Sequence, residues 1–139
     1  MKMEEGVFKK KLKEELEKYD AFVQITHGNL YQAGFPDVHI TAKTSLLSWV
    51  ECKFWGGAKP PVEFQSLHSQ MKGPQINVIK HQMWKRNAAC LLVSQIGMDL
   101  DNCAVCYKDK FNIMPWKHLA KLLAISSDFT TVLDHAIPH

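Results

Sequence analysis

Two acidic residues and a lysine stand in neighbouring extended segments of the sequence, where they can act together. Asp37 opens residues 37–41, a short run that alternates polar and apolar side chains. Glu51 and Lys53 lie two residues apart in a second extended run over 46–54. Side chains alternate between the faces of a strand, so Glu51 and Lys53 share one face. If the two strands pair, Asp37 joins them on the face opposite Val38 and Val50, which we expect to face the core.

This arrangement is chemically suited to a hard divalent cation. Two carboxylates beside tryptophans and other apolar residues are costly to desolvate without a compensating charge. Carboxylate oxygens favour Mg²⁺ or Mn²⁺, and the backbone carbonyl of Cys52 is a further candidate ligand. Glu51 and Lys53 are separated by about 7 Å along a strand, which we expect to be too wide for a tight salt bridge but wide enough for an ion and a water.

Phosphodiester hydrolysis needs a nucleophilic water, a Lewis acid for the nonbridging oxygen, and neutralisation of the negative charge that develops. Asp37 and Glu51 are the predicted metal ligands and catalytic acids. Lys53 either orients or deprotonates the water, or stabilises the developing charge, and the sequence does not choose between these roles.

Hydrophobic periodicity predicts the elements that hold these residues. Phe8, Leu12 and Leu16 recur at helical spacing in residues 4–19. Glycine and proline residues interrupt 56–74, which we expect to be a long surface loop, and no repeats are evident. The predicted strands are 21–26, 37–41, 46–54, 88–95 and 103–107, and the later predicted helices are about 75–87, 116–124 and 128–136.

The predicted order is therefore helix, three strands, helix and strand, followed by further C-terminal elements. The three consecutive strands are expected to form an antiparallel hairpin or meander. The fold class is α/β, with a mixed sheet flanked by helices. At 139 residues, we expect a single domain over 1–139 with a core at 4–97 and a C-terminal extension at 98–139.

The pattern Pro36-Asp37, 13 intervening residues and Glu51-Cys52-Lys53 resembles the PD-(D/E)XK nuclease superfamily. Residues 34–37, Gly-Phe-Pro-Asp, look like the signature of its VRR-Nuc branch, which includes small phage and bacterial proteins. The resemblance implies a restriction-endonuclease-like core and metal-dependent cleavage of nucleic acid. It covers residues 4–97.

The same resemblance implies two further site residues. Members of the branch place a glutamine at the start of the helix after the E-x-K strand, a position that Gln75 fits better than Gln82. A glutamate of the first helix often completes the metal site, and Glu5 matches better than Glu15. The resemblance thus adds Gln75 to the catalytic residues and Glu5 to the metal ligands.

The net charge of +3 permits a polyanionic partner such as DNA but does not require one. Basic residues in the loop and in the helix that follows are candidate nucleic-acid contacts, although a solvated helix face also explains them. These candidates are Lys59, Lys72, Lys80, Lys85 and Arg86.

Hydropathy, the start of the sequence and the cysteines bear on where the protein is located and on whether it binds zinc. No apolar run is long enough to span a bilayer and the start of the sequence does not resemble a secretory signal, so we expect a cytoplasmic protein without membrane contact, or a phage-encoded one in the host cytoplasm. The four cysteines are expected to be free packing thiols rather than a zinc site.

The leading hypothesis is a Mg²⁺- or Mn²⁺-dependent endonuclease acting on DNA. The alternatives are a structure-selective enzyme resembling a Holliday-junction resolvase, acting as a homodimer, and an inactive nucleic-acid-binding module.

Overall fold

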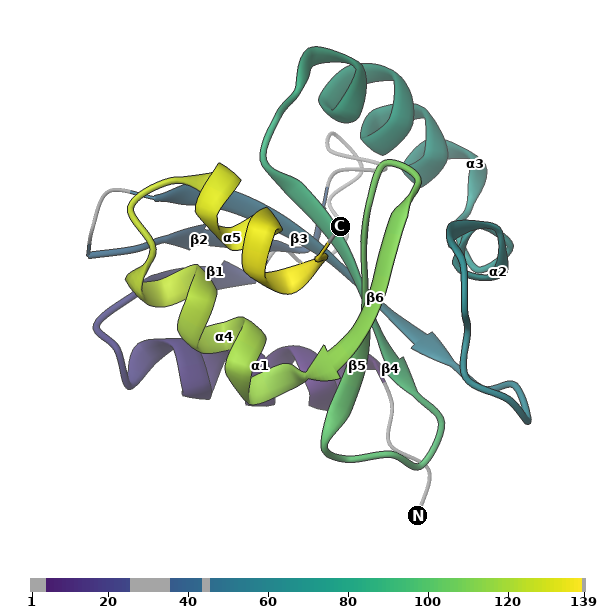
Figure 1. Cartoon of the computed structure of the whole chain (residues 1–139), viewed down its shortest axis with the longest axis horizontal. Helices are drawn as coiled ribbons and strands as arrows, with labels where there is room; N and C mark the ends of the chain where they lie inside the picture. Colours follow the sequence, from purple (N-terminus) through teal and green to yellow (C-terminus); the bar gives the residue numbers. More distant parts are fainter. Residues whose placement is uncertain (1–4, 26–35, 44–45, 139) are drawn as a thin grey trace.

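A six-stranded mixed sheet forms the centre of the protein, with helices on both of its faces (Figure 1). The computed structural model describes residues 5–25, 36–43 and 46–138, except for the side chain of Glu5. The strands are adjacent in the order in which they occur along the chain: β1 (Phe22–Ile25), β2 (Val38–Thr41), β3 (Leu47–Trp55), β4 (Cys90–Ile96), β5 (Asn102–Tyr107) and β6 (Lys110–Pro115).

Strands β1, β2 and β3 form an antiparallel meander, as the sequence predicts. β3 and β4 are parallel, and the chain between them crosses over through a run of helices. The two C-terminal strands return to antiparallel pairing. The predicted α/β class and mixed sheet are therefore confirmed.

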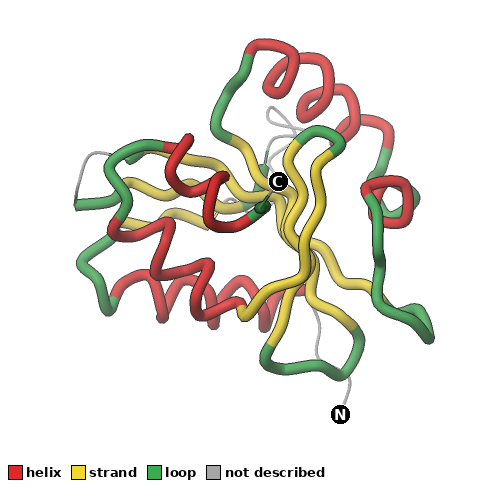
Figure 2. The backbone as a smooth tube through the Cα atoms, in the orientation of Figure 1, coloured by secondary structure: helices red, strands yellow, loops and turns green. Residues whose placement is uncertain are grey.

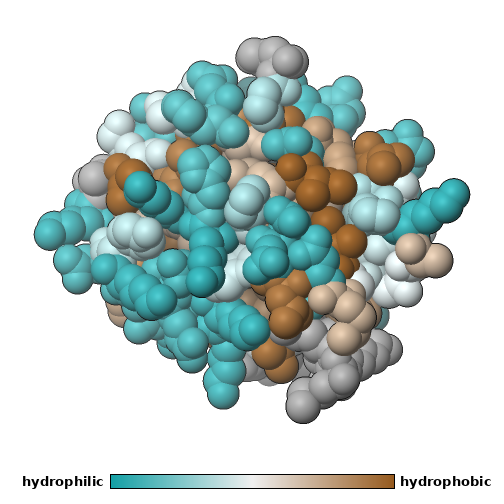
Figure 3. All heavy atoms as spheres, turned by 60° about the horizontal axis from the view of Figure 1, so that its bottom comes forward, coloured by the Kyte–Doolittle hydropathy of each residue, from teal (hydrophilic) through white to brown (hydrophobic). Residues whose placement is uncertain are grey.

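One face of the sheet is covered by α1 (Glu5–Glu17) and α4 (Trp116–Ile125), which also contact each other. The apolar stripe of α1 is fully packed, with Phe8, Leu12 and Leu16 at most 2% exposed. This packing follows from the three- and four-residue spacing of these side chains. The solvent side of α1 comes forward in Figure 3, where hydrophilic side chains predominate on much of the surface. The last helix, α5 (Phe129–Ala136), packs beside α4.

The other face carries the crossover between β3 and β4, whose helical segments appear in red in Figure 2. Gln75 in this crossover bonds to side chains of β3 on that face. The crossover contains α2 (Phe64–His68), α3 (Gly73–Ile76), a π-helix η2 (Asn77–Met83) and a 3₁₀ turn η3 (Trp84–Arg86).

The structure corrects the sequence prediction at two places. The expected loop at 56–74 contains α2, where Phe64 and Leu67 are buried three residues apart. This helix has little more than one turn, which is too short to give a clear periodic signal. The strand β6 was not predicted, because it lies at the edge of the sheet and its polar and half-buried residues obscure the alternation.

The four cysteines are free and buried, so the expectation of packing thiols is confirmed. Cys103 and Cys106 are three residues apart on β5 and therefore project to opposite faces of the sheet. Two side chains on opposite faces cannot bind the same zinc ion. Among the helices of the described ranges, none has the length and apolarity needed to cross a membrane.

We predict that Leu12→Ala lowers the free energy of unfolding by about 2–5 kcal/mol, because it leaves a cavity between α1 and the sheet. Leu12 is 0% exposed, whereas Val7 on the same helix is 44% exposed. Urea denaturation followed by circular dichroism measures the loss, with Val7→Ala as the control expected to stay near the wild type. Equal stabilities for the two variants would contradict the packing of α1.

Candidate functional site

Asp37 lies immediately before β2 and contacts two other elements of the protein. Its Oδ1 accepts a hydrogen bond of 2.9 Å from the backbone N–H of Cys52 in β3. Its Oδ2 lies 3.2 Å from Nζ of Lys9 in α1, and the Asp37 side chain is 13% exposed. The carboxylate is therefore fixed by a neutral donor on one oxygen and by a cation on the other.

The strand register explains why Cys52 is available to Asp37. The N–H of Trp49 donates to Ala89, on the side of β4, so the odd-numbered residues of β3 bond toward β4. Even-numbered residues bond toward β2, which begins at Val38 opposite Val50. β2 does not extend as far as Cys52. The Cys52 N–H therefore donates to the Asp37 side chain, where a longer β2 would have placed a backbone carbonyl. The N–H and C=O of one strand residue point to the same side, so the Cys52 carbonyl also lies on the side of Asp37.

Glu51 and Lys53 lie side by side in a buried position. Their side chains are 2% and 7% exposed, and Lys53 Nζ is 3.6 Å from Glu51 Oε1. Extending the register by one residue places Asp37 opposite Glu51, on the same face of the sheet. Glu51 and Lys53 therefore meet on one face as predicted, and Asp37 is bonded to the backbone of Cys52, the residue between them.

The expected gap between Glu51 and Lys53 was wrong. The backbone separation does not keep the charged groups apart, because both long side chains bend toward Gln75 under the crossover helix. The Gln75 side chain donates from Nε2 to Glu51 Oε1 at 2.9 Å and accepts from Lys53 Nζ on its Oε1 at 2.6 Å. One amide thus holds an acid and a base together in a buried place, where each needs a partner.

Gln75 is itself held at the beginning of α3. Its Oε1 accepts a second hydrogen bond, of 3.0 Å, from the backbone N–H of Lys72, the residue that precedes the helix. This is one half of a capping box, in which the third helical residue reaches back to the N-cap. Pro74 in the first turn favours a helix start at this point. Gln82, the other glutamine considered, is exposed on η2.

Glu5 is the remaining predicted metal ligand. The side chain of Glu5, like Gly34 and Phe35 of the Gly-Phe-Pro-Asp motif, lies outside the described residues. Glu15, the second choice, pairs with Lys18 at 3.0 Å and lies about 9 Å along α1 from Lys9. Glu15 is therefore not part of the site around Asp37.

Lys9 contacts the site and was not singled out from the sequence. It occurs in the run Lys9-Lys10-Lys11, where no one-dimensional pattern distinguishes it from its neighbours. Its helical position, one residue after the buried Phe8, places it at the margin of the packed face. Helical phase relative to Phe8 indicates only this margin, because the contact with Asp37 depends on tertiary packing.

The candidate nucleic-acid contacts are dispersed over the crossover. Lys72 adjoins the site through its bond to Gln75, and Lys59 is exposed in the loop after β3, where its carbonyl accepts the Trp55 indole N–H. Lys85 and Arg86 are exposed on η3, and Lys80 is half-buried on η2. The basic residues of the helix thus form no single group with Asp37.

The donors at the site fit a hard divalent cation. Asp37 and Glu51 offer carboxylate oxygens from directly opposite strand positions, and the Cys52 carbonyl lies on the same side as Asp37. Among the side chains that the structure describes, no group of three or more His, Cys, Asp or Glu residues could hold a metal ion. The candidate protein ligands are thus two acids and a carbonyl, and such a set would suit Mg²⁺, which keeps several waters.

The charge of these acids extends to a neighbouring thiol. Cys90 lies opposite Trp49 in the parallel pairing of β3 and β4. Burial, reinforced by the negative charges of Glu51 and Asp37, raises the pKa of the Cys90 thiol. Cys90 therefore remains protonated and is not a nucleophile of this site.

Comparison of the chain with models of known protein families gave no match. Comparison with curated protein sequences gave no match either.

We predict that Lys53→Met destabilises the protein by about 3 kcal/mol, because Glu51 loses the cation beside it while remaining buried. Urea denaturation at pH 7 measures this loss. The double variant Glu51→Gln, Lys53→Met removes both charges and should recover most of the stability. A double variant that is as unstable as Lys53→Met would contradict charge pairing as the cause.

Proposed function

We propose that the protein is a metal-dependent nuclease that hydrolyses phosphodiester bonds in DNA. The observation that carries this proposal is that Asp37 is bonded to the Cys52 N–H, while Gln75 bonds both Glu51 and Lys53, the residues on either side of Cys52. The site combines hard oxygen donors with a buried amine, as metal-assisted phosphodiester hydrolysis requires. The family resemblance points the same way, since the meander and the crossover carry the residues in the expected order and the parallel strand β4 follows them.

Asp37 and Glu51 would hold the cation, together with the Cys52 carbonyl. A bound Mg²⁺ or Mn²⁺ would supply Lewis-acid polarisation of the phosphate and lower the pKa of a water molecule. The Cys52 N–H fixes the orientation of the Asp37 carboxylate, so this donor is set in place before any ligand binds. Preorganisation of this kind reduces the reorganisation needed during the reaction.

Lys53 would act on the water or on the negative charge that develops on the phosphate. Its ammonium group donates to Gln75 and lies near Glu51, so its position is defined by two partners. Gln75 would be a positioning residue, since it bonds both Lys53 and Glu51 and is held by the helix start. The burial of Lys53 limits competition from bulk water for its charge.

The test is incubation of the protein with labelled single-stranded, duplex, flapped and four-way DNA in Mg²⁺ or Mn²⁺. We predict that Asp37→Asn, Glu51→Gln and Lys53→Met each lower cleavage by about 100-fold or more, because each removes a group that acts on the reacting phosphate. The matched control is Asp20→Asn, which removes an exposed carboxylate paired only loosely with Lys43, at 3.5 Å.

Cleavage that persists in EDTA, or in the Glu51→Gln protein, would refute the proposal. Selective cleavage of four-way DNA by a dimer would identify the structure-selective alternative. DNA binding with neither cleavage nor Mn²⁺ uptake would identify the inactive binding module.

Lys9 provides a second prediction, because its ammonium occupies the carboxylate oxygen that a metal would use. Lys9→Gln should bind Mn²⁺ about two- to fivefold more tightly by calorimetry, since the cation no longer competes with an ion pair worth up to about 1 kcal/mol. Lys13→Gln is the control, because Lys13 pairs with Glu17 on the same helix. Weaker Mn²⁺ binding by Lys9→Gln would show instead that Lys9 supports the metal site.

A further inference from the structure

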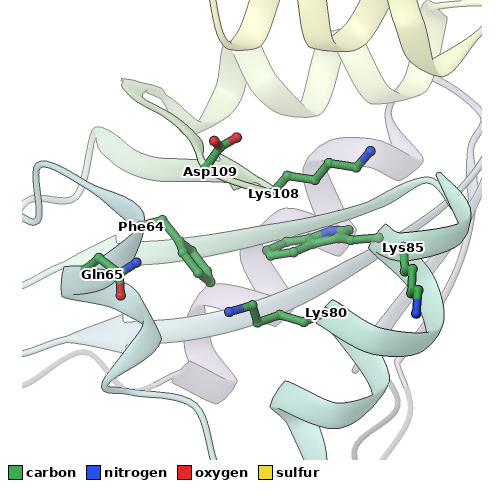
Figure 4. A pocket seen from close by; sticks show the side chains of 7 residues that line it. Phe64, Gln65, Lys80, Lys85, Lys108 and Asp109 are labelled. Atoms are coloured by element: carbon green, nitrogen blue, oxygen red, sulfur yellow. The ribbon is translucent and has the colours of Figure 1, made fainter.

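A cavity of about 420 Å³ lies beyond the candidate site, between the crossover helices and the turn that joins β5 to β6. Figure 4 shows Phe64 and Lys80 extending toward each other from α2 and η2, with Lys108 and Asp109 on the turn across from them. The volume is within the range of small-ligand sites. Its lining residues are Phe64, Gln65, Lys80, Trp84, Lys85, Lys108 and Asp109.

The floor of the cavity is aromatic. The rings of Phe64 and Trp84 meet edge to face, with centroids 5.5 Å apart. The indole N–H of Trp84 donates to the Cys90 carbonyl at 2.6 Å, so its polar atom is already bonded inside the protein. Phe64 is 6% exposed and Trp84 is 3% exposed, so these two residues offer the cavity a small area of apolar ring surface.

The rim of the cavity is basic. Lys80, Lys85 and Lys108 contribute three positive charges against the single carboxylate of Asp109. Lys80 Nζ lies 5.4 Å from the centre of the Phe64 ring, so a cation is held directly over the aromatic floor. A ligand that matches this surface has a flat apolar part and a negative charge.

Lys108 stands in a backbone conformation that lysine rarely adopts. Tyr107 pairs with Lys110, which leaves a two-residue hairpin loop, and Lys108 has φ of 56° in it. Glycine, asparagine or aspartate usually occupies such a position. The Lys108 ammonium also donates to the side chain of Asn87, which has φ of 57° at the end of η3. Lysine at a strained position beside a cavity is a pointer to a binding role.

We propose that this cavity binds an unpaired nucleotide, with its base against the exposed ring atoms of Phe64 and Trp84 and its phosphate at the basic rim. Gln65 and Asp109 at the rim offer hydrogen-bonding groups for the edge of the base. A base can enter a cavity only after it leaves the stack of a duplex, so the ligand is a single-stranded, flapped or flipped nucleotide.

The position of the cavity relates this ligand to the substrate. Gln75 and Trp84 stand at opposite ends of one helical run, separated by a distance on the order of 10 Å. The nucleotide in the cavity is therefore not the one whose bond is cut. The identification of the ligand as part of a substrate strand rests on the proposed nuclease function, and a free nucleotide has the same chemistry.

The test measures DNA affinity of the full-length protein in EDTA by fluorescence anisotropy, with a labelled single strand and a blunt duplex of the same sequence. The variant is Lys108→Asn, because asparagine tolerates positive φ and the fold should keep its melting temperature. The control is Lys121→Asn, which removes an exposed lysine of α4 on the other face of the sheet.

We expect Lys108→Asn to raise the Kd for the single strand about three- to tenfold and to reduce the salt slope of log K by about 0.7, the value for one phosphate contact on a single strand. Duplex binding and the control should stay unchanged. Unchanged single-strand binding by Lys108→Asn, or an equal loss on the duplex, would overturn the proposal. Competition by dAMP that depends on Lys108 would identify a free nucleotide as a ligand, and Lys108-dependent binding without competition would restrict the site to strands.

Cleavage assays with the same DNA separate this inference from the proposed function. If the wild type cleaves DNA and Lys108→Asn binds it normally, the cavity proposal fails alone. If the wild type cleaves no DNA but its binding depends on Lys108, the nuclease proposal fails alone.

Discussion

Glu51 and Lys53 are buried next to each other in the middle of β3, where water does not solvate their charges. Removing such groups from water costs several kcal/mol for each ion unless other polar groups replace the solvent. Gln75 replaces part of it, because a single amide can accept from the ammonium and donate to the carboxylate. The helical crossover, the cap at Lys72 and the parallel pairing of β3 with β4 all serve to bring this amide over the strand.

The short β2 strand has a complementary role. It begins at Val38, opposite Val50, and leaves the edge of β3 at Cys52 to the side chain of Asp37. If β2 began two residues earlier, its backbone would cover the edge of β3 at Cys52. The Asp37 side chain would then be turned away from Cys52. The start of β2 after Pro36 therefore determines where the carboxylate lies, and the ion pair with Lys9 balances its charge.

Much of this arrangement can be predicted from the sequence, because alternation along two strands is a local property. The shared face of Asp37, Glu51 and Lys53, the meander and the helix that carries Gln75 follow from period-two and period-3.6 patterns. Side-chain reach is different, since Lys53 and Glu51 meet by bending toward Gln75, which lies 22 residues after Lys53 in the chain. Lys9 and Lys108 could not be identified for the same reason, as their contacts with Asp37 and Asn87 are set by tertiary packing. The edge strand β6 and the short α2 lacked enough buried residues to give a local signal.

A crystal structure of the wild-type protein grown with Mn²⁺ would show whether Asp37 and Glu51 bind one cation. We predict an anomalous scattering peak within bonding distance of oxygens of both Asp37 and Glu51, with the Lys9 ammonium displaced from Asp37. Full Mn²⁺ occupancy elsewhere, with the ion pair between Lys9 and Asp37 still intact, would contradict it.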